Sequence, residues 1–411
     1  MKNAIRAILA LMVLLAFAAT ACGSAPSGND AALAPAAISL TWTEDSLDTL
    51  TVTWQTTAAA AGQVRFGPRA AGAGAVRTVA AQMQPVHTNQ GVRYVHSAVL
   101  RGLQPDTDYR YQVAAGAVWS RSYRFTAAGQ QAFAFLVFGD SQSVNYAVWR
   151  DTLQQARLAN PGAAFMTVVG DLVDVGGDYG QWQDWFGAGE GVLESLPVMP
   201  LPGNHESYTP ERVFSRPQLF TSLFSLPQNG PAGMQEQAYS FDYGDVHFVM
   251  LDTQAGEQRE FLPDLLQRQT AWLETDLAGS GAKWKIVFMH RPPYDNKSFR
   301  DNIAVRQAFT PLFDQYGVDL VFSGHDHVYA RSHPLLDGTA AARGPVYIAT
   351  GRSGSKVYAN TAANPLNAVF YNPQDEPNYL TVTVGSDSIR VVAVKQSGAV
   401  LDSWTLRKPG A

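Results

Sequence analysis

The chain has a single cysteine, Cys22, and only 16% of its 411 residues are charged. With one cysteine, no disulfide can form within a monomer, and an all-cysteine zinc site is excluded. The 30 basic and 35 acidic side chains give a formal charge of −5, so the basic excess typical of nucleic-acid-binding proteins is missing. What the chain does contain is 46% hydrophobic residues, which is enough for two packed domains or one large one.

The N-terminus has the pattern of an export signal. Lys2 and Arg6 precede an apolar run at 7–19 that is shorter than the roughly 20 residues of a membrane span. Small residues then lead directly to Cys22, which resembles the lipidated cysteine of bacterial lipoprotein signals. We therefore expect a signal peptide at 1–21, a flexible tether at 22–37, and an exported protein anchored to a membrane of the bacterial cell envelope through Cys22. The alternative is an ordinary secretory signal with an incidental cysteine.

Residues 38–128 are predicted to form a small β-sandwich. Alternating β-branched and aromatic runs are separated by Gly, Pro and Asp turns, at 49–56, 63–67, 93–101, 107–114 and 118–126. The segment from Leu103 to Val113 resembles the corner of fibronectin type III modules, in which a tyrosine, here Tyr109, fixes the corner through its hydroxyl. His87 and His96 stand singly, so we expect structural roles for both.

Residues 132–408 are predicted to form an α/β domain. Strands and helices alternate from Phe133 to about Leu201, which indicates a parallel sheet. We expect a strand at 198–201 and a helical stretch around 210–224, followed by further strands and helices and by antiparallel strands near the C-terminus. This mixture predicts two sheets face to face with helices outside, a four-layer α/β/β/α sandwich.

Five apolar runs in this region end beside a side chain that can bind a metal. The runs at 133–139, 165–170, 198–201, 284–289 and 318–322 precede Asp140, Asp171, Asn204, His290, and the pair His325 and His327. In α/β proteins, ligands bind at the carboxyl ends of strands. We therefore expect one metal site at the edge of a sheet.

The donor set points to two metal ions. Two carboxylates, an amide and three imidazoles suit Zn, Mn or Fe, and Gln142 is a further candidate ligand. Six or seven donors exceed what one tetrahedral ion needs and suit two ions about 3.5–4 Å apart that share a carboxylate. Such a centre stays positively charged and attracts an anion. Hydrolysis of a phosphate ester by attack of a metal-bound hydroxide is therefore the leading hypothesis.

The motifs resemble those of the calcineurin-like metallophosphoesterases. The carriers, in order, are Gly139-Asp140, Gly170-Asp171, Gly203–Glu206, Met289-His290 and Gly324–His327. The preceding β-sandwich, together with His327-Val-Tyr329-Ala-Arg331, is most similar to the purple acid phosphatase branch. The resemblance implies that Asp140 and His327 hold the first metal, Asp171 bridges, and Asn204, His290 and His325 hold the second. It also implies that His205 faces the phosphate and that Glu206 orients or tunes His205. We expect Asn204 and Arg291 to contact substrate as well.

Two positions depart from the family pattern. Asp174 stands where purple acid phosphatases carry the tyrosine that binds ferric iron, and Gln142 stands where the wider superfamily has histidine. A purple ferric centre is therefore not expected, and the metal identity among Fe, Mn and Zn is left open.

The predicted function is hydrolysis of phosphate monoesters of small molecules, without nucleic-acid binding. The alternative within enzymes is a phosphodiesterase acting on nucleotides or lipid head groups, because both activities use the same ligands. The alternative of another class is a non-catalytic surface binding protein. The natural substrate and the oligomeric state are left open.

Overall fold

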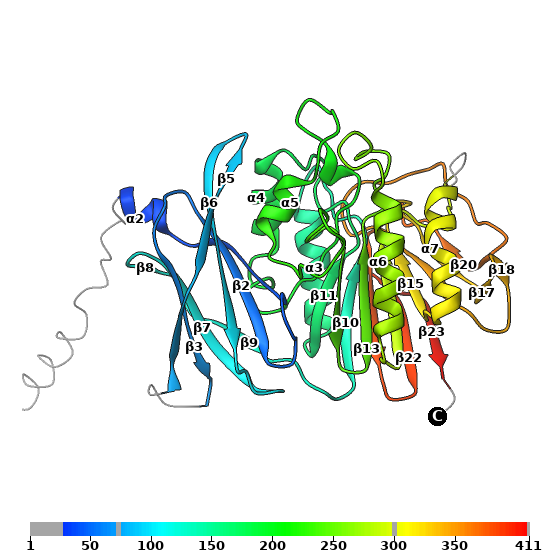
Figure 1. The fold of residues 1–411 in the computed structure, drawn as a ribbon, viewed down its shortest axis with the longest axis horizontal. Helices are drawn as coiled ribbons and strands as arrows, with labels where there is room; N and C mark the ends of the chain where they lie inside the picture. Colours follow the sequence, from blue (N-terminus) through cyan, green and yellow to red (C-terminus); the bar gives the residue numbers. More distant parts are fainter. Residues whose placement is uncertain (1–27, 71–74, 298–301, 409–411) are drawn as a thin grey trace, which may run out of the picture.

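The computed structural model describes residues 28–70, 75–297 and 302–408 (Figure 1). The expected signal peptide at 1–21 and Cys22 lie outside the described residues. Within the described part, no helix is long and apolar enough to cross a membrane. Residues 28–37, which we expected in a flexible tether, contain helix α2 (Gly28–Leu33) and the start of strand β1 (Ala36–Thr41). The carbonyl of Ala32 accepts hydrogen bonds from the backbone of Thr57 and Ala58, so this segment packs against the sandwich.

The N-terminal region is a β-sandwich. One sheet has the order β1-β2-β6-β5, with β2 (Thr49–Thr56), β6 (Gly91–Arg101) and β5 (Gln82–Thr88). The other has the order β4-β3-β7-β8, with β4 (Arg77–Ala80), β3 (Gly62–Pro68), β7 (Asp108–Ala115) and β8 (Val118–Trp119), and β9 (Tyr123–Thr126) also pairs with β7. The Tyr109 hydroxyl accepts a hydrogen bond from the backbone of Gln104 at 2.9 Å, which confirms the predicted tyrosine corner.

The second region contains two large sheets. The five-stranded sheet has the order β11-β10-β21-β22-β23, with β11 (Ala163–Val168), β10 (Phe133–Phe138), β21 (Asn378–Val384), β22 (Ser388–Lys395) and β23 (Val400–Arg407). The seven-stranded sheet has the order β12-β13-β14-β15-β19-β16-β20, with β12 (Tyr239–Tyr243), β13 (Val246–Leu251), β14 (Trp284–Met289), β15 (Leu320–Ser323), β19 (Val346–Thr350), β16 (Tyr329–Ser332) and β20 (Asn367–Tyr371). A hairpin of β17 (Leu335–Leu336) and β18 (Thr339–Ala340) lies at the side.

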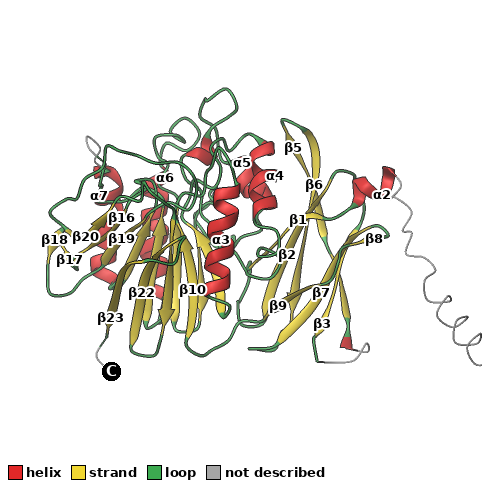
Figure 2. Cartoon of the chain, turned by 180° about the vertical axis from the view of Figure 1, so that it is seen from behind, coloured by secondary structure: helices red, strands yellow, loops and turns green. Residues whose placement is uncertain are grey.

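Helices cover the outer faces of these two sheets, which confirms the four-layer prediction. Helices α6 (Leu265–Gly279) and α7 (Ile303–Tyr316) lie on one side, and α3 (Ala147–Ala159) and α4 (Tyr179–Ala188) on the other (Figures 1 and 2). The central strands β13, β15 and β19 of the seven-stranded sheet are buried on both faces, with side chains alternating between them. On β14, Val287 packs with residues of α6 and α7, whereas Phe288 belongs to the core shared with the five-stranded sheet. Ring contacts such as Phe135 with Phe248, 5.4 Å between centroids, join the two sheets.

The β-sandwich packs directly against the α/β domain, and the two share one continuous apolar core. Trp42 lies 5.7 Å from Phe165, measured between ring centroids, and the backbone of Val198 donates to the carbonyl of Leu40 at 2.8 Å. Because backbone hydrogen bonds and buried rings cross the junction, the sandwich also stabilises the α/β domain.

Two expected elements differ from the structure. Residues 198–201 make only isolated bridges, from Val198 to Met166 of β11 and from Leu201 to Val169 just after it, and form no full strand. The helical stretch expected around 210–224 is reduced to α5 (Gln218–Leu223). The shortening has a local cause, because Arg212 adopts a positive φ of 61° and Pro217 stands at the start of the helix.

Candidate metal centre

The predicted ligands meet where the two large sheets end side by side. Asp140 and Asp171 follow β10 and β11 of the five-stranded sheet, whereas His290 and His325 follow β14 and β15 of the seven-stranded sheet. The sequence led us to expect one sheet edge, and this was wrong because the strands divide between two sheets. Asp140 and His290 are fully buried, so the centre lies inside the molecule rather than on its surface.

Glycines before the ligands let the chain segments approach each other closely. A Cβ atom at Gly203 would lie 2.2 Å from Oδ1 of Asp171, and one at Gly324 would lie 2.5 Å from Oδ1 of Asp140. Both distances are far below van der Waals contact. Glycine in these motifs is therefore required by the position of the neighbouring carboxylate.

Three of the predicted ligands have strained backbone conformations. Asp171, His325 and His327 have φ values of 51°, 67° and 55°. Non-glycine residues rarely adopt this left-handed region, and each instance costs on the order of 1–3 kcal/mol. Strain of this kind persists where the surrounding structure enforces it, and it concentrates at functional sites.

One ligand group consists of Asp140, Asp171 and His327, whose ligand atoms lie within 4.8 Å of one another. Nε2 of His327 lies 2.8 Å from Oδ2 of Asp140, and Nδ1 donates to the carbonyl of Lys356 at 2.8 Å, so the ring presents Nε2 to the group. The amide of Gln142 donates from Nε2 to Oδ2 of Asp171 at 3.1 Å, and its oxygen accepts from Lys356 at 3.3 Å. Gln142 thus borders this group with its amide nitrogen.

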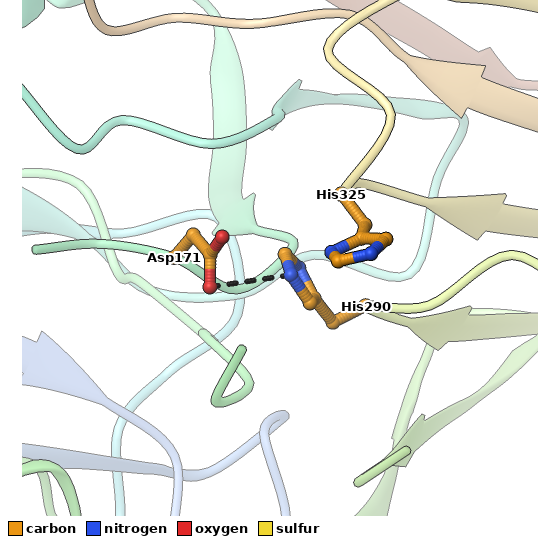
Figure 3. A group of neighbouring side chains, drawn as sticks. All are labelled: Asp171, His290 and His325. Carbon is orange, nitrogen blue, oxygen red and sulfur yellow. Dashed lines mark ion pairs between the residues drawn. The ribbon is translucent and has the colours of Figure 1, made fainter. Parts of the chain in front are cut away.

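The second ligand group consists of Asp171, His290 and His325, drawn in Figure 3. Nε2 of His290 lies 3.2 Å from Oδ1 of Asp171 and 3.2 Å from the amide oxygen of Asn204. Its Nδ1 donates to the carbonyl of Val169 at 2.9 Å, which again leaves Nε2 facing the ligands. Asp171 is common to both groups, in agreement with its expected bridging position.

The electrostatics of the site fit cations. Burial raises the pKa of Asp171, but the neighbouring imidazoles of His290 and His205 hold it well below its usual range. Burial lowers the pKa of His290, yet the carboxylates of Asp171 and Asp140 raise it to about 9. Burial and the positive charges of Arg291 and Lys297 hold the pKa of His325 well below its usual range. Two buried groups of oxygen and nitrogen donors that share one carboxylate fit two divalent or trivalent ions.

His205 lies beside the ligand groups, held from behind by Asp174. Its Nδ1 donates to the Asp174 carbonyl at 2.7 Å and lies 3.2 Å from the Asp174 carboxylate, and its Nε2 lies 3.8 Å from Oδ2 of Asp171. Burial lowers the pKa of His205, but Asp171 and Asp174 outweigh it and place the pKa above the usual range. Asp174 also binds Arg212 at 2.6 Å, so its role is to fix His205 and this loop.

The side chain of Glu206 turns toward the loops that carry the ligands, and its expected role in orienting or tuning His205 stays a prediction. Its carboxylate accepts hydrogen bonds from the four backbone N–H groups of Gly203, Asp171, Leu172 and Val173. Those groups belong to the two loops that carry Asp171 and Asn204. Glu206 is the middle residue of a turn of 3₁₀ helix, η2 (His205–Ser207), from which its side chain reaches back to these loops.

Arg291 is paired within the protein. Its guanidinium binds Glu257 at 2.6 Å, contacts Gln254 at 3.2 Å, and lies 3.0 Å from Nε2 of His325. These contacts fix it beside a metal ligand, and contact with substrate stays a prediction.

The sequence analysis did not identify Lys356 and Tyr208. Nζ of Lys356 lies 3.0 Å from Nε2 of His205, and the ring of Tyr208 lies 5.2 Å from that of His205, centroid to centroid. One pattern pointed to Lys356, because β19 is a further apolar run closed by a glycine, Gly351, at the start of the loop that carries it.

Comparison with known proteins follows this geometry. Residues 35–127 match the purple acid phosphatase N-terminal domain, and residues 133–329 match the calcineurin-like phosphoesterase family. The chain is 30% identical over 347 residues to acid phosphatase type 7 of Mus musculus, covering 74% of this chain and 75% of that protein. It is 32% identical over 192 residues to purple acid phosphatase 23 of Arabidopsis thaliana, covering 45% and 40%. Among solved structures, purple acid phosphatase PPD1 from yellow lupin seeds is similar in fold, with a TM-score of 0.75 and 20% identity over 91% of this chain and 74% of that chain.

Proposed function

This chain belongs to the calcineurin-like phosphoesterases, in the purple acid phosphatase branch, and from that premise we propose that it hydrolyses phosphate monoesters. It is a phosphate-ester hydrolase with a binuclear metal centre. The observation that carries the proposal is the arrangement of two buried ligand groups that share Asp171, with His205 beside them. Beyond this, we propose that the enzyme prefers monoesters, is exported and is anchored to a membrane.

In this proposal Asp140 and His327 would hold the first metal, with Gln142 beside them, and Asn204, His290 and His325 would hold the second. Asp171, which is common to both ligand groups, would serve both metals. When bound, the two ions supply Lewis acidity toward a phosphoryl group and activate a water at neutral pH. The protein's own contribution is to fix these donors on buried, strained loops before substrate arrives, so that little reorganisation is needed during reaction.

His205 acts on the substrate from the side of the metals. Its Nδ1–H is engaged by the Asp174 carbonyl, which directs Nε2 toward the ligand groups. Burial lowers the pKa of His205, but the carboxylates of Asp171 and Asp174 raise it overall, which favours protonation of the ring. When protonated, the ring stabilises charge on the phosphoryl oxygens and passes its Nε2 proton to the leaving oxygen. Asp174 holds the ring in place through the same contact.

The test is a comparison of wild type with His205→Ala, on chain lacking residues 1–22. Metal per chain, the visible spectrum, and turnover of an aryl monoester and the matching diester are measured. We expect two metals per chain, a colourless solution, faster monoester turnover, and a kcat reduced about 10²–10³-fold in His205→Ala with its metals retained. Faster diester turnover would replace the proposed activity by the phosphodiesterase alternative. Absence of both metal and turnover after reconstitution would favour a binding protein, and a purple band would show that a tyrosinate does bind iron.

The proposed location is the extracytoplasmic side of the bacterial cell envelope, with a lipid on Cys22. The support is the order of charged, apolar and small residues before Cys22. Expression of the full chain and of Cys22→Ser in a bacterial host, followed by membrane fractionation, tests this. The full chain is expected in the membrane fraction and Cys22→Ser is not. Equal membrane association of both would contradict lipidation.

A further inference from the structure

Lys356 is placed at the metal centre by both its backbone and its side chain. Its carbonyl accepts from Nδ1 of His327 at 2.8 Å and so orients that ligand. Its Nζ lies 3.0 Å from Nε2 of His205 and 3.3 Å from the amide oxygen of Gln142. The ammonium group therefore lies between the first ligand group and the proposed proton donor.

Within the part of the chain that the structure describes, the ammonium of Lys356 makes no short ion pair that would explain it as a structural group. The carboxylate that it faces, Asp174, lies 3.4 Å away and is held at 2.6 Å by Arg212 from the other side. The Lys356 side chain is also 32% exposed, so solvent reaches it. An ammonium group that is compact, rotatable and placed in this way can bind an anionic ligand beside His205.

We propose that the ammonium of Lys356 binds a non-bridging oxygen of the substrate phosphate and makes the site prefer the dianion of a monoester over the monoanion of a diester. The inference rests on the proposed function and adds a specificity-determining residue to it. A monoester brings one more negative charge near neutral pH, and its oxygens carry no second ester group. A cation beside His205 therefore attracts the phosphate of a monoester more strongly than that of a diester.

A purely structural role for Lys356 makes a different prediction. If the lysine only neutralised Asp174 and thereby steadied His205, removal of either of the two cations that flank Asp174 would have the same effect. Arg212 is the matched control, since it binds the same carboxylate at 2.6 Å while its side chain is 54% exposed at the outside. Arg212→Gln therefore tests loss of charge near Asp174 without loss of the Lys356 ammonium.

The experiment compares wild type, Lys356→Met, Lys356→Arg and Arg212→Gln as metal-loaded chains. For each, kcat and KM are measured for an aryl monoester and a diester of the same phenol, together with the inhibition constant of inorganic phosphate and the metal content. We expect Lys356→Met to lower monoester kcat/KM about 10²-fold. Diester kcat/KM is expected to fall no more than a few-fold, and phosphate inhibition to weaken about tenfold or more, with two metals retained. Lys356→Arg should restore part of the preference, and Arg212→Gln should leave the monoester-to-diester ratio unchanged.

The proposal is overturned if Lys356→Met reduces both esters equally, or if phosphate inhibition is unchanged. It is also overturned if Arg212→Gln shifts the ratio as much as Lys356→Met does. The phosphate measurement separates this inference from the proposed function. A wild type that prefers diesters, with phosphate binding weakened in Lys356→Met, would refute the monoesterase proposal while keeping Lys356 as the anion-binding group.

Discussion

Two buried histidines in this protein, His290 and His247, have similarly raised pKa values but lie in different structural settings. His290 lies 3.2 Å from Asp171 in the metal centre, and His247 lies between Asp242 and Asp276, at 2.7 and 2.8 Å. In both cases burial lowers the imidazole pKa, and the carboxylates outweigh it and raise the pKa to about 9. A histidine beside carboxylates therefore does not by itself mark a metal site.

The difference between the two settings lies in the backbone and in the number of donors. His290 ends strand β14, beside a carboxylate whose backbone is strained and beside further donors from other loops. His247 is in the regular part of β13, directly opposite Asp242 of β12, and the Asp242 side chain is 72% exposed. At His290, several strand ends bring enough donors together for a metal site. At His247, a side chain paired across two strands forms only a stabilising ion pair.

The largest effect is expected from Asp171→Asn, because this carboxylate serves both ligand groups. The variant should lose both metals and more than about 10²-fold in kcat/KM, beyond the range for a residue that only orients a ligand. Metal analysis and steady-state kinetics measure this. The matched control is Asp276→Asn at His247, which should keep two metals and full activity. If Asp171→Asn retained two metals, the proposed difference between the carboxylates at His290 and at His247 would be wrong.

Next in size is Glu206→Gln. The carboxylate accepts from four backbone N–H groups in the loops that carry Asp171 and Asn204, and an amide nitrogen cannot accept such bonds. We expect a loss of about 10–100-fold in metal affinity or activity, the usual cost of removing a group that orients metal ligands. Titration of the metal-free variant with metal measures the affinity. An unchanged affinity together with unchanged turnover would assign Glu206 no role in holding these loops.

A smaller effect is expected from Gln142→Ala than from Asn204→Ala. The structure directs the oxygen of Asn204 at His290, whereas Gln142 directs its nitrogen at Asp171 and its oxygen at Lys356. Gln142→Ala should weaken binding of one metal by less than about tenfold, below the usual cost of removing an orienting group. Chelator titration of both variants gives the comparison. Equal losses would show that Gln142 coordinates through its oxygen after rotation of the amide.

The sequence was sufficient to predict which side chains meet at the candidate metal centre, and the reason is local. Each of these side chains follows an apolar run. Gly203 and Gly324 are required because their loops approach the carboxylates of Asp171 and Asp140 closely. The division of the strands between two sheets could not be predicted, because it depends on pairing of β10 with β21 near the other end of the chain. The backbone partners of Glu206 could not be predicted for a similar reason, since three of the four lie on another loop, at 171–173. Lys356 was missed because the apolar run closed by Gly351 marks only the start of its loop and does not show that the side chain five residues later reaches His205.

The smallest effect is expected from His247→Asn, and it concerns stability alone. The His247 pKa is raised from 6.5 to about 9 in the folded protein. The ion pairs of His247 with Asp242 and Asp276 should therefore contribute their full stability below pH 6.5 and lose it as the pH rises through about 9. Because Asp242 is largely exposed and screened by water, we expect a contribution of about 1–3 kcal/mol rather than more. Thermal unfolding of wild type and His247→Asn at pH 6 and pH 10 measures it: the variant should be less stable at pH 6 and nearly equal at pH 10, with metals and activity retained near neutral pH. A constant difference between the two proteins at both pH values would mean that His247 stabilises by packing and not by charge.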